Sequence, residues 1–229
     1  MNLAHASLPK PKAILFDFDD TLIDTWPFLW RLYQDTFAQF NIVLTDLLTE
    51  TACRDKAVRD GRKTFEDVLG TTLGPKACEI FLTTYAKTFP NHITPLPGAS
   101  HALQSLSQQN IPLGIVSNKH STFLNQELKI LGWEGFFKSI VGYDCVGRKP
   151  NPQTITHALS HMHFEDKKTD HHAVWLIGDS FVDFETAQNS GCFFIHFGEY
   201  IPCDARFQPG ASVANWNQFH EILNNIRIK

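Results

Sequence analysis

Acidic residues stand at two places where an apolar run of the sequence ends. Asp17 and Asp19 follow the first run, and Asp179 and Asp183 follow a later one. Residues two apart on a strand project to the same side, so Asp17 and Asp19 can lie close together. Two facing carboxylates repel each other, so the pattern fits a divalent cation beside them or one protonated carboxyl that does acid–base chemistry. Aspartates that only cap a helix or close a turn are the structural alternative for this pair.

Groups that bind anions follow two other segments. Ser117 and Asn118 close another apolar run and offer a hydroxyl and an amide to an anionic oxygen. Lys149 stands before a helix that begins with proline, and it adds the positive charge that a phosphoryl group requires. If the strand before Asp179 neighbours the strand before Asp17, all of these groups meet in one crevice at the edge of a sheet.

The segments between these residues predict the fold that positions them. Five short apolar runs are typical of strands buried on both faces: Ala13–Phe16, Ile111–Val116, Ser139–Tyr143, Ala173–Ile177 and Cys192–Phe197. From the second run onward they are separated by stretches with helical spacing: Ser121–Leu131, Asn151–His163 and Phe181–Asn189. Strand alternating with helix predicts an α/β fold with a doubly wound, mainly parallel sheet.

A long helical segment interrupts this alternation after the first strand. Residues 25–91 show helical spacing and no strand-like run. Thr64 has the character of a helix N-cap, and Pro75 stands where another helix can begin. We therefore expect an inserted, all-helical cap domain of about four helices at 25–91, with a core domain formed by residues 1–24 and 92–229.

Four motifs with chemical character follow one another in order: Asp17-x-Asp19-x-Thr21-Leu22, Ser117-Asn118, Lys149-Pro150-x-Pro152 and Gly178-Asp179-Ser180-x-x-Asp183. In type and order they resemble the haloacid dehalogenase superfamily of phosphohydrolases, over about residues 12–197. The helical insert is similar to the helical cap of that superfamily, and the chain looks most like phosphoglycolate phosphatases. This resemblance implies a Rossmann-like core and Mg²⁺ as the cofactor.

The resemblance also implies roles for the acidic residues. Asp17 is implied as the nucleophile that forms a phosphoaspartyl enzyme. Asp19 is implied as the acid that protonates the leaving alkoxide and then as the base that deprotonates water. Mg²⁺ is implied to bind the Asp17 carboxylate, the Asp19 backbone carbonyl and Asp179. Asp183 is implied either as a further ligand through water or as the residue that orients Lys149.

The remaining motif residues are implied to bind the phosphoryl group. Ser117, the Asn118 backbone and Lys149 would hold its equatorial oxygens and stabilise charge in the transition state. Thr21 would orient the nucleophile by a hydrogen bond. Asp20 departs from the family pattern, which has glycine there in many members, and we expect it to point away from the metal and to cap the following helix.

Basic residues cluster in the insert, at positions 54, 56, 59, 62 and 63. A solvated helix face explains most of them. The functional alternative is that one or two reach the anionic tail of a phosphorylated substrate. Arg54 and Arg59 are the candidates for this role, because arginine can bind a carboxylate through two parallel hydrogen bonds.

Composition excludes several classes of protein. Twenty basic and 24 acidic residues among 229 give a formal charge of −4, without the positive field that non-specific binding to nucleic acid requires. No apolar stretch is long enough for a membrane span or a signal peptide. The five cysteines are odd in number and contain no C-x-x-C pair, which argues against a disulfide framework or a zinc ribbon. We expect a cytoplasmic protein without nucleic-acid or membrane partners, and the oligomeric state is open.

The function that these features favour is a Mg²⁺-dependent phosphomonoesterase acting on a small phosphorylated metabolite, similar to phosphoglycolate. A 2-haloacid dehalogenase of the same fold is disfavoured by Asp19, because departure of a halide needs no general acid. A phosphomutase shares Asp17 and Asp19 and stays an alternative. A catalytically silent binding protein would usually lack the nucleophile or a metal ligand, and all of these residues are present.

Overall fold

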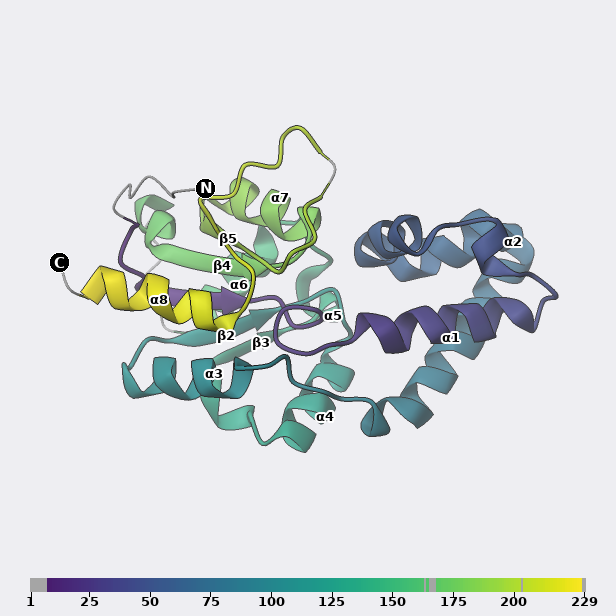
Figure 1. Ribbon diagram of the computed structural model, residues 1–229, viewed down its shortest axis with the longest axis horizontal. Helices are drawn as coiled ribbons and strands as arrows, with labels where there is room; N and C mark the ends of the chain where they lie inside the picture. Colours follow the sequence, from purple (N-terminus) through teal and green to yellow (C-terminus); the bar gives the residue numbers. More distant parts are fainter. Residues whose placement is uncertain (1–7, 163, 165–167, 203, 228–229) are drawn as a thin grey trace.

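A six-stranded parallel sheet forms the centre of the molecule. The computed structural model describes residues 8–162, 164, 168–202 and 204–227, without the side chains at 56, 58, 59, 168–170, 225 and 227. The strand order is β3-β2-β1-β4-β5-β6, and every neighbouring pair is parallel (Figure 1). The strands are β1 Ala13–Phe16, β2 Leu113–Val116, β3 Ser139–Val141, β4 Val174–Gly178, β5 Phe193–Phe197 and β6 Ala211–Val213.

Helices connect the strands and pack on both faces of the sheet. Outside the segment that follows β1, they are α3 Ala99–Gln108, α4 Ser121–Leu131, α5 Tyr143–Val146, α6 Gln153–His161, α7 Phe181–Ser190 and α8 Trp216–Arg227, with 3₁₀ turns at Glu134–Phe136 and Lys168–Ala173. The predicted α/β fold with a doubly wound sheet is confirmed.

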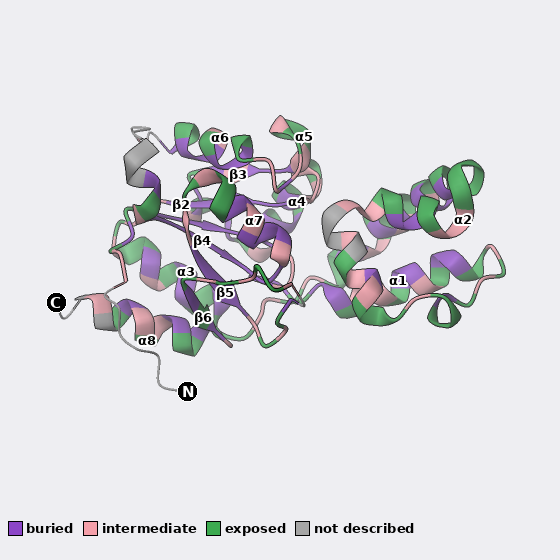
Figure 2. Ribbon diagram, turned by 90° about the horizontal axis from the view of Figure 1, so that it is seen from above, coloured by how far each residue is buried: buried purple, intermediate pink, exposed green. Residues whose placement is uncertain are grey.

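The alternation of side chains along β1 explains why the sheet has two hydrophobic cores. Ile14 and Phe16 belong to the core shared with α3, α4 and α8. Ala13 and Leu15 belong to the core shared with α6 and α7. All four side chains are fully buried, and the strands appear as buried elements between exposed helix faces in Figure 2. A strand buried on both faces reads as a continuous apolar run, which is why β1 was predictable.

The segment after β1 forms a separate helical body beside the sheet (Figure 1). It contains α1 Trp26–Ala38 and α2 Glu50–Thr88, with 3₁₀ turns at Leu44–Asp46 and Phe89–Asn91, and it has its own hydrophobic cluster. We call α1 and α2 with their connections the helical insert. Helix α2 is broken at Asp60 and at Gly70, where φ is +74°, so α1 and the three parts of α2 make four helical pieces. No helix in the described part of the chain is long and apolar enough to cross a membrane.

The predicted elements differ from the observed ones in position and in number. The five predicted strands are present, with ends displaced by at most two residues. The breaks in α2, at Asp60 and Gly70, lie four and five residues before the helix starts predicted at Thr64 and Pro75. Strand β6 and helices α3, α5 and α8 were not predicted. Three residues of β6 are too few to show a strand periodicity.

Candidate active site

The strand order brings the predicted catalytic residues to one edge of the sheet. β1 lies between β2 and β4, and Phe16 is in register with Ile115 and Ile177. The residues that follow these strands therefore lie side by side. The Asp17 backbone N–H donates to Ile177 O at 2.8 Å, which fixes Asp17 next to the end of β4. In parallel α/β sheets, ligands bind in the crevice at the carboxyl ends of the strands.

Lys149 joins two of the predicted acids. Its Nζ donates to Asp17 Oδ1 at 2.7 Å and to Asp183 Oδ1 at 2.5 Å, and all three residues are buried. Asp183 Oδ2 accepts from the backbone N–H and the hydroxyl of Ser180, in the capping box that begins α7. Both oxygens of Asp183 are therefore engaged. Asp17 Oδ2, in contrast, accepts no hydrogen bond from any residue that the structure describes.

Burial and neighbouring charge shift the acid equilibria at this edge. Burial raises the pKa of Asp17 to about 7; Lys149 acts to lower this pKa, and the charges of Asp183 and Asp19 act to raise it. Burial and the acids Asp20, Asp17 and Asp183 raise the pKa of Asp179 well above its usual range. Burial acts to lower the pKa of Lys149, but Asp17 and Asp183 raise it above its usual range. The raised pKa values mean that Asp17 and Asp179 resist ionisation in this crevice. A cation bound beside them would favour their ionised forms.

A hydrogen-bonded chain leads from Asp19 to the helical insert. Lys119 Nζ donates to Asp19 Oδ1 at 2.7 Å and to the two Glu127 oxygens at 2.8 and 2.9 Å. The hydroxyl of Tyr85, on α2, donates to Glu127 Oε1 at 2.5 Å. Thr25 Oγ1 also donates to Asp19 Oδ1, at 2.7 Å. Asp19 Oδ2 accepts no hydrogen bond within the described residues, and this oxygen is the one available for proton transfer.

The chain between Asp19 and α1 turns back on itself. The backbone N–H groups of Leu22 and Ile23 both donate to Phe18 O, and Asp20 adopts a left-handed conformation with φ of +57°. Glycine tolerates this conformation best, and aspartate is among the few other residues that visit it. Asp20 Oδ1 accepts from the backbone N–H groups of Thr25 and Trp26, so the predicted capping of the following helix is confirmed.

Two expectations for this turn need correction. Asp20 does not stand apart from the predicted metal ligands, because its Oδ2 lies 3.3 Å from Arg54 Nη2, and the same nitrogen donates to Asp179 Oδ2 at 2.7 Å. Thr21 Oγ1 is buried and has no hydrogen-bond partner in the described part of the chain, so the predicted bond to Asp17 is not formed. The tight turn around Phe18 O buries Thr21 fully, away from a partner.

Ser117 and Asn118 lie at the end of β2 next to Lys149. Ser117 is buried, and its Oγ accepts from the Lys119 backbone N–H at 3.2 Å. The Asn118 side chain grips the backbone of Lys149: its Oδ1 accepts from Lys149 N at 2.7 Å, and its Nδ2 donates to Lys149 O at 3.3 Å. The Asn118 carbonyl accepts from Arg148 at 3.2 Å. The asparagine side chain therefore positions the lysine loop.

Of the two arginines predicted to bind substrate, the structure describes the side chain of Arg54 only. Arg54 is engaged by Asp179 and Asp20, and its guanidinium lies over the rings of Trp26 and Tyr200, at 5.9 and 5.2 Å from their centroids. The pKa of Arg54 is raised by these acids, against the effect of burial. The side chain of Arg59 lies outside the described residues.

The predicted metal ligands fit Mg²⁺ by their chemistry. Asp17, Asp179 and Asp183 each offer one carboxylate oxygen, and these oxygens lie within 4.8 Å of one another. Hard oxygen donors are what Mg²⁺ prefers, usually one or two carboxylates completed by water. Of the three, Asp183 is the least available because Lys149 and Ser180 occupy both of its oxygens.

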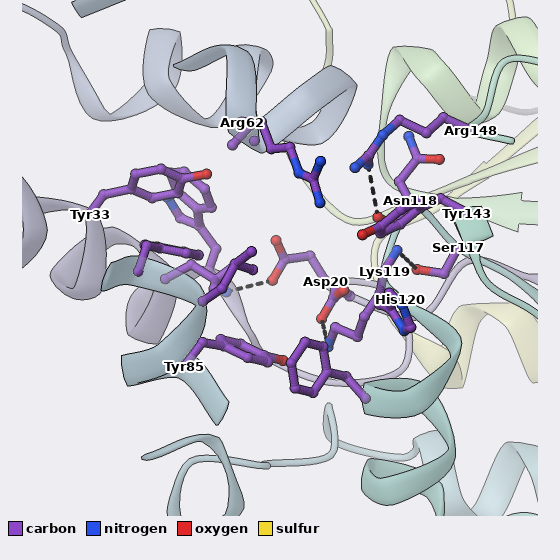
Figure 3. A pocket seen from close by; sticks show the side chains of 18 of the residues that line it. Asp20, Tyr33, Arg62, Tyr85, Ser117, Asn118, Lys119, His120, Tyr143 and Arg148 are labelled. Atoms are coloured by element: carbon purple, nitrogen blue, oxygen red, sulfur yellow. Dashed lines mark hydrogen bonds and ion pairs between the residues drawn. The ribbon is translucent and has the colours of Figure 1, made fainter. Parts of the chain in front are cut away.

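A cavity of about 340 Å³ opens between this edge and the helical insert. Figure 3 shows Asp20 near its middle, Lys119 and Ser117 on the core side, and Tyr33 and Tyr85 on the side of the insert. Its lining includes Lys149 and every predicted catalytic or metal-binding acid except Asp183. Its volume falls in the range of small-molecule sites, about 300 to 1,000 Å³.

Two guanidinium groups without a carboxylate partner among the described residues also line this cavity. Arg62 enters from α2, and Arg148 enters from the core, stacked over the Tyr143 ring at 3.9 Å (Figure 3). Burial raises the pKa of the Cys78 thiol, and the charges of Arg62 and Arg148 both oppose that rise. Both guanidinium groups therefore lie near one side chain of the insert.

Sequence reasoning missed Lys119, Glu127, Tyr85 and Arg148. A signal existed for Lys119, which directly follows Ser117-Asn118 at the end of β2, and for Arg148, which directly precedes Lys149. Glu127 and Tyr85 carried no such signal. Each lies on a helix at a position that reads as part of an ordinary helical face, and only the packing of the insert against α4 brings them together.

Known proteins are similar to this chain in sequence, and solved structures are similar to it in fold. The phosphoglycolate phosphatase of Mesorhizobium japonicum is 26% identical over 214 residues, covering 89% of this chain and 91% of the relative. The pyrophosphatase PpaX of Oceanobacillus iheyensis is 26% identical over 184 residues, covering 78% of this chain and 79% of the relative. The crystal structure of a HAD-superfamily hydrolase from Ehrlichia chaffeensis superposes with a TM-score of 0.64 at 26% identity, covering 96% of this chain and all of that one.

The profile of one family spans most of the chain. The haloacid dehalogenase-like hydrolase profile matches residues 14–197, from β1 to the end of β5. This range contains all four motifs and the helical insert. The chain is a hydrolase that belongs to the haloacid dehalogenase-like family.

Proposed function

We propose that this hydrolase is a Mg²⁺-dependent phosphomonoesterase that cleaves a small phosphorylated metabolite through a phosphoaspartyl intermediate. The observation that carries this proposal is the state of Asp17, which lines the cavity: its Oδ1 is held by Lys149, and its Oδ2 has no hydrogen-bond partner among the described residues. Asp19 stands two residues away with one uncommitted oxygen. The names of similar proteins make phosphoglycolate the first ester to test.

Asp17, Asp179 and the Asp19 backbone carbonyl would hold the Mg²⁺, and Asp183 serves mainly to position Lys149. When bound, the cation neutralises charge on the phosphoryl oxygens and on the converging carboxylates. Lys149 and Ser117 would bind the remaining phosphoryl oxygens, since both are buried at the same strand ends. Asn118 keeps Lys149 in place through its two hydrogen bonds to the lysine backbone.

In the first half of the reaction, Asp17 Oδ2 attacks phosphorus and the ester P–O bond breaks. The departing alkoxide takes the proton of Asp19, so the alcohol leaves neutral and the phosphoryl group stays on Asp17. In the second half, Asp19 removes a proton from a water molecule, and the water oxygen attacks phosphorus. The bond to Asp17 then breaks and inorganic phosphate leaves. Splitting the displacement in this way replaces one difficult step by two easier ones.

The helical insert, residues 25–91, is proposed as a cap domain over residues 1–24 and 92–229. Its own hydrophobic cluster and its position beside the catalytic edge support this assignment. We also propose a cytoplasmic location, supported by the finding that the described cysteines form no disulfide. A small-molecule phosphate ester is the proposed partner.

The proposal is tested by measuring phosphate release from phosphoglycolate and a panel of other phosphate esters with and without Mg²⁺. We expect activity only with Mg²⁺, and a loss of at least about a thousandfold in Asp17→Asn. Asp24→Asn, which changes an exposed aspartate in the same loop, is the control and should keep full activity. Hydrolysis of no ester by the wild-type protein, or substantial turnover by Asp17→Asn, would contradict the proposal.

A further inference from the structure

The cavity above the catalytic edge has two unlike ends. One end carries the carboxylates and Lys149. The other is made largely by apolar and aromatic side chains of the helical insert, joined by one phenylalanine of α4: Trp26, Leu29, Tyr33, Phe65, Phe81, Leu82, Tyr85 and Phe123. Most of these belong to the hydrophobic cluster of the insert, so the cavity cuts into the face of that cluster.

The insert is already closed against the core around this cavity. Arg54 reaches Asp179 at 2.7 Å and Tyr85 reaches Glu127 at 2.5 Å. The Tyr200 hydroxyl, from the loop after β5, donates to Asp55 on α2 at 2.8 Å. These contacts join the insert to three different parts of the core. The cavity therefore persists in a closed arrangement, and its apolar end is part of the site and not a gap between open domains.

Aromatic packing makes the apolar end rigid. The ring of Tyr33 lies 4.6 Å from Phe81 and 5.2 Å from Phe65, and Tyr85 meets Phe123 edge to face at 5.1 Å. Rings fixed at such distances stabilise one another, so they do not collapse readily into the cavity. An apolar surface held open in this way favours a ligand group that removes it from water.

The volume indicates how large that group is. A cavity of about 340 Å³ lies within the range for sites that take drug-sized ligands. The phosphoryl group occupies only the acidic end, beside Asp17 and Lys149. A two-carbon acid such as glycolate would reach little of this apolar end, which we call the aromatic wall.

We propose that the physiological substrate is a phosphate monoester of an alcohol that carries an apolar, planar group larger than glycolate, and that this group packs on the aromatic wall of the helical insert. The inference rests on the proposed phosphomonoesterase function and specifies the part of the substrate that leaves as the alcohol. It assigns substrate selection to the insert.

The first test compares two esters that differ only in the proposed feature. Ethyl phosphate and 2-phenylethyl phosphate are both esters of primary alcohols, with leaving groups of similar basicity. We expect kcat/KM of the wild-type protein to be at least about tenfold higher for 2-phenylethyl phosphate, since even one methylene in an apolar pocket gives about tenfold discrimination or more. The non-hydrolysable 2-phenylethylphosphonate should likewise inhibit more tightly than ethylphosphonate.

A matched pair of variants tests whether the cavity lining causes the preference for 2-phenylethyl phosphate. Leu82 lines the cavity and is 37% exposed, whereas Leu73 lies on the same helix, is 44% exposed and is not part of the lining. Leu82→Asn should lower kcat/KM for 2-phenylethyl phosphate by about threefold or more, and by a larger factor than for ethyl phosphate. Leu73→Asn should change neither value. Both leucines are partly exposed, so the variants should fold.

The possible outcomes distinguish a failure of this inference from a failure of the proposed phosphomonoesterase function. If neither ester nor any other phosphate ester is hydrolysed, the phosphomonoesterase proposal itself fails. If both esters are hydrolysed with equal kcat/KM, the function stands and the aromatic-group inference is overturned. The inference is also overturned if wild-type discrimination is present but Leu82→Asn and Leu73→Asn preserve it equally.

Discussion

Lys119 Nζ lies 2.7 Å from Asp19 Oδ1, at the end of a hydrogen-bonded chain that starts at the Tyr85 hydroxyl on the helical insert and passes through Glu127. The proposed general acid is thus held by a lysine whose other partner touches the insert. Closure of the insert and the position of Asp19 are therefore physically connected. Lys119 is half-buried, and the neighbouring Asp19 and Glu127 raise its pKa, so it stays charged.

Tyr85→Phe removes one hydrogen bond of this chain and keeps the aromatic ring in the cavity wall. We expect kcat to fall severalfold for alkyl phosphates, whose leaving groups need the proton of Asp19, and to change little for 4-nitrophenyl phosphate, whose leaving group does not. The free energy of unfolding should fall by about 1 kcal/mol. Equal loss with both substrates would show that Tyr85 acts only on the general stability of the site.

Asp179→Asn and Asp183→Asn should affect Mg²⁺ differently. Asp179 is expected to be a direct ligand, whereas both Asp183 oxygens are engaged by Lys149 and Ser180. The dissociation constant for Mg²⁺, measured from the dependence of the melting temperature on Mg²⁺ concentration, should rise more in Asp179→Asn. The reverse order would mean that Asp183 is the direct ligand and that the ion pair to Lys149 opens when the metal binds.

The Mg²⁺-induced rise in melting temperature should depend on pH. Burial raises the pKa of Asp17 to about 7 in the metal-free protein, with Lys149, Asp183 and Asp19 as the charges that face it. Between its unfolded pKa near 4 and 7, the folded state binds more protons than the unfolded state, so this group lowers stability as pH rises through that window. Mg²⁺ needs the ionised carboxylate, so its dissociation constant should fall by at least about tenfold from pH 5 to pH 8.

Asp17→Asn is the control for this pH dependence. The variant has no carboxyl to titrate at position 17, so the Mg²⁺-induced shift should be smaller and should vary less with pH. A wild-type shift that is the same at pH 5 and pH 8 would show that Asp17 is not a metal ligand.

Arg62 and Arg148 should recognise a second anionic group, if a substrate carries one, better than Arg54 does. Arg54 is committed to Asp179 and Asp20, whereas the other two guanidinium groups line the cavity without a carboxylate partner in the described part of the chain. Arg62→Ala should therefore lower kcat/KM for phosphoglycolate by about tenfold and leave its neutral analogue 2-hydroxyethyl phosphate unchanged.

Lys63→Ala is the matched control, because Lys63 is an exposed neighbour that does not line the cavity. It should leave both values unchanged. If Arg54→Ala, and not Arg62→Ala, selectively impairs phosphoglycolate, then the original candidate is correct and its ion pair with Asp179 exchanges for substrate.

Much of the fold was predictable because its signals are local. The strand β1 is four consecutive apolar residues that end at Asp17, and burial on both faces of a parallel sheet requires such a run. The adjacency of Asp17 and Asp179 was predicted only on the condition that the strands before them are neighbours, and the pairing of β1 with β4 meets this condition. Strand β6 escaped prediction because it is three residues long. Helix α8 did carry a local signal that was not used, because its buried residues Trp216, Phe219 and Leu223 recur at three- and four-residue steps.

The site was less predictable where a role depends on packing between distant helices. The sequence marks Arg54 as one of five similar basic residues, and only the structure shows that it reaches Asp179, 125 positions away. Thr21 fits the family motif, yet the turn around Phe18 leaves its hydroxyl buried without the expected bond. The aromatic wall reads in the sequence as the ordinary core of the insert, and most of it is that core as well.

The central claim is that Asp17 carries the phosphoryl group during turnover. Its most direct test is to quench the wild-type protein with acid during turnover of a hydrolysed ester with Mg²⁺, and to measure the mass of the peptide that contains Asp17. We expect that peptide to gain the mass of one phosphoryl group, on Asp17, and to lose it when the substrate is exhausted. Turnover without phosphorylation of Asp17 under rapid quenching, or a phosphoryl group found on another residue, would contradict the claim.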